Sequence, residues 1–201
     1  KKKKITSNFS LHTPIFDKSD INSISQAIKS TWISTKGKKT IIFENLLGKY
    51  FKTKYAVATN SGTSALFLSL KSLNVKIGDE IIIPNISFIA VPNAIIYNGA
   101  TPHIVDTTEN ELNICPKKLE SYLVKNTRIV NNKCINKKTG KRIAGIIAVH
   151  IFGHMCDMDR LKKICKKFKM FLIEDAAQSI GSYNEKGINS GKLGDIACFS
   201  F

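Results

Sequence analysis

A short run of small residues has the composition of an anion-binding turn. Asn60-Ser61-Gly62-Thr63-Ser64 precedes an apolar stretch that reads as a helix. Such a turn presents free backbone N–H groups and hydroxyls at the positive end of a helix, which suits a phosphate. A serine or threonine cap without any ligand explains the same residues. The spacing matches neither a P-loop nor a dinucleotide-binding fingerprint.

Two further polar residues stand where apolar segments end. Asp175 directly follows the apolar run 170–174 and is itself followed by Ala176, Ala177 and Gln178. A carboxylate among apolar neighbours requires a partner, although capping of the next segment is an alternative use of Asp175. Ser200 ends another apolar run and could reach an anion.

One aromatic residue, Phe88, is placed where a strand gives way to a helix. There it could stack on a flat ring, which contributes about 0.5–1.5 kcal/mol beyond the burial of area. Taken alone, a phenylalanine in this position is more typical of the hydrophobic core.

Two groupings resemble metal sites. His150, His154 and Cys156 have zinc-like spacing, but Gly153 breaks any helix between the histidines and the sequence indicates no fourth ligand. We therefore expect no metal there.

Asp157-Met158-Asp159 has the pattern of a metal-binding D-x-D. It also begins an amphipathic segment, 157–169, whose lysines fill the side opposite its apolar residues. Capping of that helix is the expected role of these acids.

Apolar β-rich runs alternate with helical segments, which predicts an α/β fold with a mainly parallel sheet between helical layers. The first 52 residues read as an arm with helices near 20–30 and 40–51, and residues 53–201 as the main domain. The polar segment 131–141 predicts an exposed loop or hairpin. The expected strands are 55–59, 80–84, 102–106, 143–151, 170–174 and 196–200.

The composition restricts the class of protein. The chain has 201 residues, of which 43% are hydrophobic, and a formal net charge of +16. No apolar run reaches the roughly 18 residues of a membrane span, and no signal peptide is evident, so we expect a cytoplasmic protein. The five cysteines are widely spaced and are expected to be free thiols. The lysines are scattered, which argues against nucleic-acid binding.

Several of these motifs occur together in the order that is typical of one family. The chain resembles the DegT/DnrJ/EryC1/StrS sugar aminotransferases, which use pyridoxal 5′-phosphate (PLP). The resemblance extends over essentially the whole chain. It rests on segments 60–66, 88–90, 93–95, 150–159, 174–178 and 194–201.

The resemblance implies a role for each candidate residue. Asp175 is expected to pair with the pyridinium nitrogen and Gln178 to approach the 3′ oxygen, both as catalytic residues. Phe88 is expected to cover the ring. The residues expected to hold the cofactor phosphate are Gly62, Thr63, Ser64 and Ser200.

The family also implies a fold and a reaction. The fold is the three-layer α/β/α large domain of type I PLP aminotransferases, with active sites completed across a homodimer. The reaction transfers an amino group, with glutamate as the expected donor, to a nucleotide-linked sugar. Segments 134–143 and 150–154 resemble the branch that aminates 4-keto-6-deoxy sugars for legionaminic-acid-type nonulosonates, although Gln178 stands where much of that branch is expected to have glutamate.

The family's Schiff-base lysine follows the Phe-Ser-Phe segment, so it is expected just beyond Phe201, and the chain is expected to be an N-terminal fragment of a longer enzyme. Histidine at that position would instead indicate a sugar dehydratase of the same family. A non-catalytic regulatory or nucleic-acid-binding protein that uses the positive charge is the alternative from another class.

Overall fold

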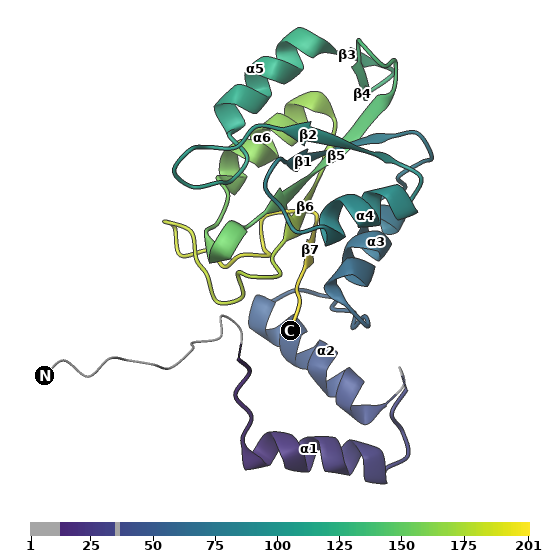
Figure 1. Ribbon diagram of the computed structural model, residues 1–201, viewed down its shortest axis with the longest axis vertical. Coiled ribbons are helices and arrows are strands. Elements are labelled where there is room, and N and C mark those ends of the chain that lie inside the picture. The colour runs from purple at the N-terminus through teal and green to yellow at the C-terminus, as the bar shows by residue number, and fades with distance from the viewer. Residues whose placement is uncertain (1–12, 35–36) are drawn as a thin grey trace, which may run out of the picture. The chain divides into compact units, whose positions relative to one another are not determined.

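The computed structural model describes residues 13–34 and 37–201. The chain divides into two compact units, Lys1–Ala58 and Thr59–Phe201. Figure 1 shows the helices of the first unit in purple and blue and the sheet of the second unit in teal to yellow. No helix in the described part of the chain is long and apolar enough to cross a membrane.

The first unit contains two helices, α1 (Lys18–Lys29) and α2 (Lys38–Phe51), close to the two predicted ones. Asp17 and Asp20 form a capping box that satisfies the first N–H groups of α1. Lys52 ends α2 in the left-handed conformation, with φ 49°.

Residues 55–59 do not form the predicted strand. Tyr55 and Val57 are 73% and 76% exposed, and the backbone N–H of Ala58 donates to Glu44 Oε1 at 2.8 Å. The apolar, β-rich composition of this segment was suitable for a strand, but strand formation also requires a neighbouring strand to pair with. None of the described strands pairs with this segment.

The second unit is built on a seven-stranded sheet in which most neighbours are parallel. Along the main path the order is β2-β1-β5-β4-β3, while β6 pairs with β5 and β7 pairs with β6. The strands are β1 (Glu80–Pro84), β2 (Thr101–Val105), β3 (Thr127–Val130), β4 (Lys133–Asn136), β5 (Arg142–Val149), β6 (Phe171–Asp175) and β7 (Ile196–Cys198). Five of the six predicted strands are therefore present with small shifts at their ends.

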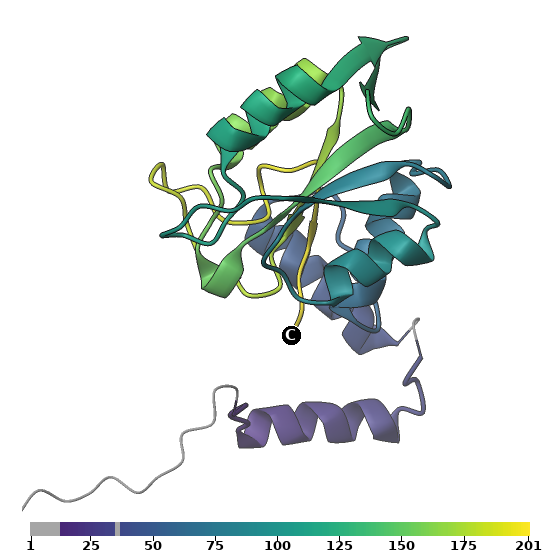
Figure 2. The same cartoon turned by 45° about the horizontal axis from the view of Figure 1, so that its top comes forward.

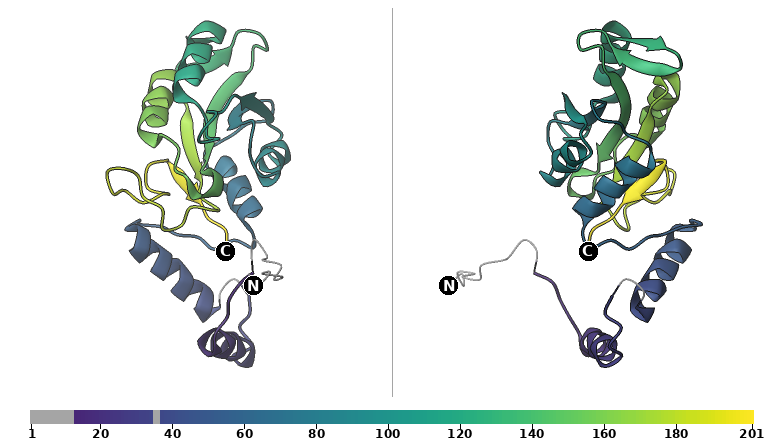
Figure 3. Two further views of the ribbon diagram at one scale, coloured as in Figure 1. Left: turned by 60° about the vertical axis from the view of Figure 1, so that its left-hand side comes forward. Right: turned by 90° about the vertical axis from the view of Figure 1, so that its right-hand side faces the viewer.

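Helices cover both faces of this sheet, as Figures 2 and 3 show. One layer is α3 (Gly62–Ser72) and α4 (Ala90–Tyr97), and the other is α5 (Pro116–Asn126) and α6 (Met158–Phe168). This is the predicted three-layer α/β/α arrangement.

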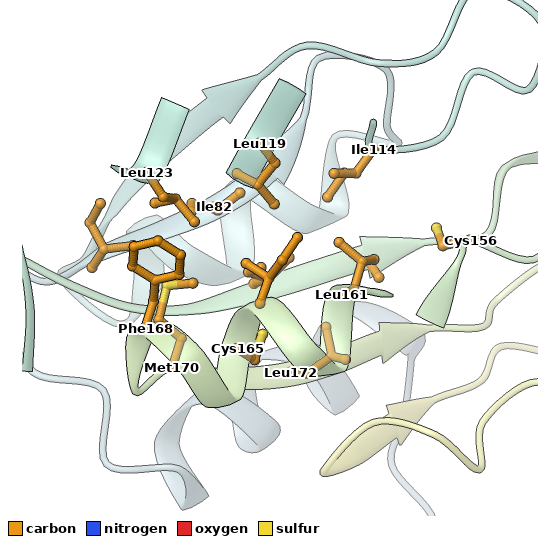
Figure 4. Close-up of a cluster of buried hydrophobic side chains, with 14 of the residues drawn as sticks. Ile82, Ile114, Leu119, Leu123, Cys156, Leu161, Cys165, Phe168, Met170 and Leu172 are labelled. Carbon is orange, nitrogen blue, oxygen red and sulfur yellow. The ribbon is translucent and has the colours of Figure 1, made fainter. Parts of the chain in front are cut away.

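Each helical layer has its own hydrophobic core. Beneath α5 and α6, side chains such as Leu119 and Leu161 meet Ile82 and Leu172 of the sheet, as seen in Figure 4. On the opposite face, α3 and α4 pack on alternate residues of the same strands, including Ile173. The two cores fix which strand residues face which helices.

The predicted exposed segment forms part of an antiparallel hairpin, β3–β4, followed by a turn. The hairpin turn is Asn131-Asn132, whose φ values of 47° and 60° are those of a type I′ turn. The strand β3 before it was not predicted.

A buried carboxylate ties the hairpin to the sheet. Glu80 of β1 accepts hydrogen bonds from Asn136 Nδ2 at 2.8 Å and Thr139 Oγ1 at 2.6 Å, and contacts His103 Nδ1 at 2.8 Å. Burial raises the pKa of Glu80, but the hydrogen bonds from Thr139, Asn136 and His103 outweigh it and hold the pKa below 4.5.

Candidate active site

The exits of four parallel strands meet at one edge of the sheet. Strands β1, β5, β6 and β7 are neighbours in that order and run parallel, so their carboxyl ends lie together. Asp175 is the last residue of β6, and the segments that follow β1, β5 and β7 carry Phe88, Phe152 and Ser200. Ligands of open α/β sheets bind at such an edge.

The start of α3 has two unused backbone donors. Ser61 caps the helix in extended conformation, and its Oγ accepts from Ser64 N at 3.1 Å, so the capping interpretation is confirmed for this serine. The N–H groups of Gly62 and Thr63 make no hydrogen bond to the described residues. They stand at the positive end of an 11-residue helix and are therefore free to bind an anion.

Ser200 lies directly against this helix end. A Cβ placed on Gly62 would be 3.1 Å from Ser200 Cβ and 3.3 Å from Ser200 Oγ. The absence of a side chain at Gly62 lets the Ser200 hydroxyl approach the first turn of α3. The structure thus brings together residues from opposite ends of the unit, as the sequence interpretation required.

Asp175 is the last residue of β6 and is 6% exposed. Side chains alternate along a strand, so Asp175 shares a face with Ile173, which lies in the core beneath α3 and α4. Among the described residues its carboxylate accepts one hydrogen bond, from Ala177 N at 3.2 Å, and it forms no ion pair. Burial raises its pKa above the ordinary 3.8.

Its neighbour Glu174 is in the opposite situation. Glu174 points to the α5–α6 face, is fully buried, and accepts from the N–H groups of Gly191, Leu193 and Gly194 at 2.8, 2.7 and 2.6 Å. His150 Nε2 adds a fourth contact at 3.0 Å. Burial raises the pKa of Glu174, but the hydrogen bonds from His150, Gly194 and Gly191 outweigh it and keep the pKa below 4.5.

Sequence reasoning missed this function of Glu174 and His150. The available signal was a second acid inside an apolar strand, next to Asp175. The donors that satisfy it are backbone groups of residues 191–194, and no side-chain pattern reports them.

Gln178 holds the turn that follows β5. Its Oε1 accepts from Phe152 N at 3.1 Å, and Phe152 has left-handed backbone angles, φ 51° and ψ 26°. Because a backbone N–H can only donate, the oxygen of the amide must face Phe152. The NH2 group of Gln178 is the end that remains for another partner.

Phe88 is 73% exposed, so its interpretation as a core residue is wrong. It stands between β1 and α4, on the edge where the parallel strands end. An exposed aromatic ring at this edge is available to stack on a planar ligand.

The two metal-like groupings have other roles. Asp157 caps α6 by accepting from Arg160 N at 3.1 Å, as expected, and Asp159 pairs with Lys186. Both nitrogens of His150 are engaged, Nε2 with Glu174 and Nδ1 with Cys156 N. In the part of the chain that the structure describes, no three His, Cys, Asp or Glu residues are grouped to hold a metal.

A helix end with two N–H groups that bond to no described residue, a nearby hydroxyl and a buried acid without a described counter-ion lie together at the carboxyl edge of the parallel sheet. In an α/β domain this is the place of a ligand site, and its chemistry suits a ligand with both an anionic and a cationic group. Comparison with known proteins agrees with this interpretation. Residues 14–201 match the DegT/DnrJ/EryC1/StrS aminotransferase family, and the chain belongs to that family.

Curated relatives of known name are similar along nearly the whole chain. GDP-perosamine synthase of Caulobacter vibrioides is 34% identical over 192 residues, 96% of this chain and 47% of that protein. UDP-4-amino-4,6-dideoxy-N-acetyl-beta-L-altrosamine transaminase of Campylobacter jejuni is 36% identical over 186 residues, 92% of this chain and 45% of that protein. The chain therefore spans slightly less than half the length of these relatives.

Solved structures share the fold. The putative sugar aminotransferase Spr1654 of Streptococcus pneumoniae, in its PLP form, has a TM-score of 0.81 at 30% identity, covering 97% of this chain and 49% of that one. An aminotransferase from Psychrobacter cryohalolentis has a TM-score of 0.79 at 30% identity, covering 94% of this chain and 44% of that one.

Proposed function

We propose that the protein carrying this chain transfers an amino group, from glutamate, to the 4-keto group of a nucleotide-linked 4-keto-6-deoxy sugar, using PLP. The membership of the chain in a sugar aminotransferase family supports the class of reaction. The relatives named for perosamine synthesis and for a 4-amino-4,6-dideoxy sugar support a nucleotide sugar as substrate. The product is expected to enter surface polysaccharide or nonulosonate biosynthesis.

The contrast between Glu174 and Asp175 carries the proposal. Both acids are buried at the end of β6, but Glu174 has four hydrogen-bond donors and Asp175 has one. A buried carboxylate with one neutral donor favours a cationic partner, and a protonated pyridine nitrogen is such a partner. Asp175 is accordingly assigned to the ring nitrogen.

The remaining residues are each assigned to a different part of the cofactor. The N–H groups of Gly62 and Thr63, with the hydroxyls of Ser64 and Ser200, are assigned to the phosphate. Phe88 is assigned to the face of the ring. The amide NH2 of Gln178 is assigned to the 3′ oxygen, because its Oε1 is held by Phe152.

When bound, PLP supplies the electron sink that amino transfer requires. Asp175 would keep the ring nitrogen protonated, and the helix end would hold the phosphate in place. None of the assigned residues offers an amine for covalent attachment of the cofactor. We propose that a lysine after Phe201 has that role, and reading the codons that follow Phe201 tests this.

The direct test uses the full-length protein that carries this chain, here called the parent protein. It compares wild type with Asp175→Asn and with a control, Asp106→Asn, in which the changed acid is exposed and paired with Lys118. We expect Asp175→Asn to lower turnover of glutamate and the keto sugar at least about 100-fold, in line with the roughly 3–5 kcal/mol of a broken buried ion pair. The cofactor absorbance band should shift as well. Wild-type turnover and an unchanged spectrum in Asp175→Asn would show the assignment to be wrong.

Two alternatives have their own tests. Histidine in place of the proposed lysine would favour a sugar dehydratase, which removes a hydroxyl of the sugar as water and leaves no amino group on the product. Salt-dependent binding to duplex DNA, with no PLP binding, would favour a regulatory protein that uses the charge of +16.

We further propose that the parent protein is a cytoplasmic homodimer. Phe88, Phe152 and Tyr183 are 73%, 72% and 58% exposed, and exposed aromatic rings of this kind are typical of binding or subunit surfaces. Sedimentation of the purified parent protein measures its subunit number.

A further inference from the structure

We infer that Glu174 and His150 form a positioning pair, which acts from the far face of the sheet to place the Ser200 hydroxyl at the start of α3. The inference rests on the proposed function, in which Ser200 contacts the cofactor phosphate. Neither member of the pair is assigned to the cofactor.

Glu174 holds together three segments that are distant in the sequence. Its Oε1 accepts from Leu193 N and Gly194 N, and its Oε2 from Gly191 N and His150 Nε2. It thereby joins β6 to the residue that follows β5 and to the loop that precedes β7. Its carboxylate is fully buried, so water does not compete for these bonds.

The loop is connected to Ser200 by a short and well-bonded strand. Asp195 N donates to Leu172 O at 2.7 Å, and Asp195 Oδ2 accepts from Leu172 N at 2.8 Å. Strand β7 then pairs with β6 as far as Cys198, whose carbonyl accepts from Ala176 N at 2.8 Å. Ser200 follows two residues later, so the position of the loop sets where β7 and Ser200 emerge.

His150 contributes as a neutral donor. Its Nδ1 accepts from Cys156 N at 3.2 Å and so carries no proton, which leaves the proton on Nε2, the nitrogen that faces Glu174. The pair therefore contains one negative charge surrounded by N–H donors. A carboxamide at position 174 would turn its NH2 group toward some of these donors and would lose their hydrogen bonds.

A substitution at Gly194 would disturb the same loop without changing any charge. A Cβ at Gly194 would be 2.8 Å from Leu172 O and 3.2 Å from Ile196 O, both backbone atoms, and 3.1 Å from Glu174 Cγ. The loop would have to move to accept alanine. Glu174→Gln and Gly194→Ala should therefore have the same effect on Ser200, the first through lost hydrogen bonds and the second through steric displacement of the loop.

The test compares affinities for PLP and for pyridoxal, which lacks the phosphate, in the parent protein. Glu174→Gln should weaken PLP binding about tenfold and leave pyridoxal binding unchanged, as should Ser200→Ala. Because Glu174 is inferred to act through Ser200, the double variant should bind PLP no more weakly than Ser200→Ala alone. Glu120→Gln, a change in a surface ion pair with Lys167, serves as control.

Equal losses for PLP and pyridoxal would indicate a general loss of structure, and additive losses in the double variant would indicate that Glu174 acts independently of Ser200. Either result would overturn the inference.

A second measurement needs no cofactor. In Glu174→Gln and in Gly194→Ala, amide hydrogen exchange should accelerate in residues 191–200 and stay unchanged in α4 and β2. Unchanged exchange in residues 191–200 would contradict the positioning role, whatever the protein binds. Faster exchange in that segment in a protein that binds no PLP would support the positioning role and refute the proposed function.

Discussion

Gly62 and Ser200 are in such close contact that a methyl group on Gly62 would stand 3.1 Å from the Cβ of Ser200. That distance is tighter than ordinary packing, so Gly62→Ala should displace the serine by a few tenths of an ångström. We expect about tenfold weaker binding of PLP to the parent protein, with little change in melting temperature.

Gly48→Ala is the matched control. Gly48 lies inside α2, and a Cβ there would be 3.5 Å from Thr53 O, an ordinary contact. We expect this change to leave the affinity for PLP unchanged and to raise the free energy of unfolding slightly, because alanine is a better helix former than glycine. Equal affinities in wild type and Gly62→Ala would show that Ser200 and Gly62 do not form one phosphate site.

The buried Glu80 should make stability depend on pH in the acid range. Because its folded pKa is below the ordinary 4.5, the carboxylate stabilises the fold above pH 4.5, and this contribution is lost as the pH falls through the folded pKa. Glu80→Gln should lower the free energy of unfolding at pH 7 by about 1–3 kcal/mol. The difference between the two proteins should shrink on acidification.

Urea unfolding at pH 7 and at a series of lower pH values measures this difference, with the exposed Glu185→Gln as control. A difference that stayed constant with pH would mean that the carboxylate of Glu80 is not the titrating group.

The cysteines should differ sharply in reactivity. Burial raises the pKa values of Cys156, Cys165 and Cys198 to about 12, and also raises that of Cys134. Cys115 is only half-buried. Brief treatment of the native protein with iodoacetamide at pH 8 should therefore modify Cys115 first, and mass spectrometry of the digest identifies the site. Modification of all five at one rate would indicate that the buried cysteines are accessible.

The turn of the β3–β4 hairpin should be sensitive to the residue type at Asn132. Its φ of 60° is tolerated by asparagine and glycine but is strained for other residues. Asn132→Ala should destabilise the protein by about 1 kcal/mol, and Asn132→Gly should be neutral or stabilising. Thermal unfolding of the two variants checks this order of stabilities. If Asn132→Ala were as stable as Asn132→Gly or more stable, the turn would not have the described geometry.

The sequence predicted the layers, most strands and the residues gathered at the sheet edge, because these follow from periodicity and from where apolar runs end. It was wrong for residues 55–59, since their β-pattern lacks a strand to pair with in the described structure. The exposure of Phe88 depends on the atoms that surround it in the folded chain, and these cannot be predicted from the residues next to it in the sequence.

Glu174 shows that prediction of the site from the sequence is limited in the same way. The burial of its side chain could be expected from the apolar strand around it. The backbone donors of Gly191, Leu193 and Gly194 belong to a loop that only folding brings to it. Loops that satisfy a buried charge with main-chain groups leave little trace in side-chain patterns.

The order of the parallel strands also determines when the site can exist during synthesis. The first turn of α3 leaves the ribosome long before Ser200, which follows β7, the strand that pairs with β6. Parallel pairings of this kind close large loops and are slow to form. The contact between Gly62 and Ser200 can therefore form only after nearly the whole unit has been synthesised, so a ligand that requires both residues cannot guide the early folding of the unit.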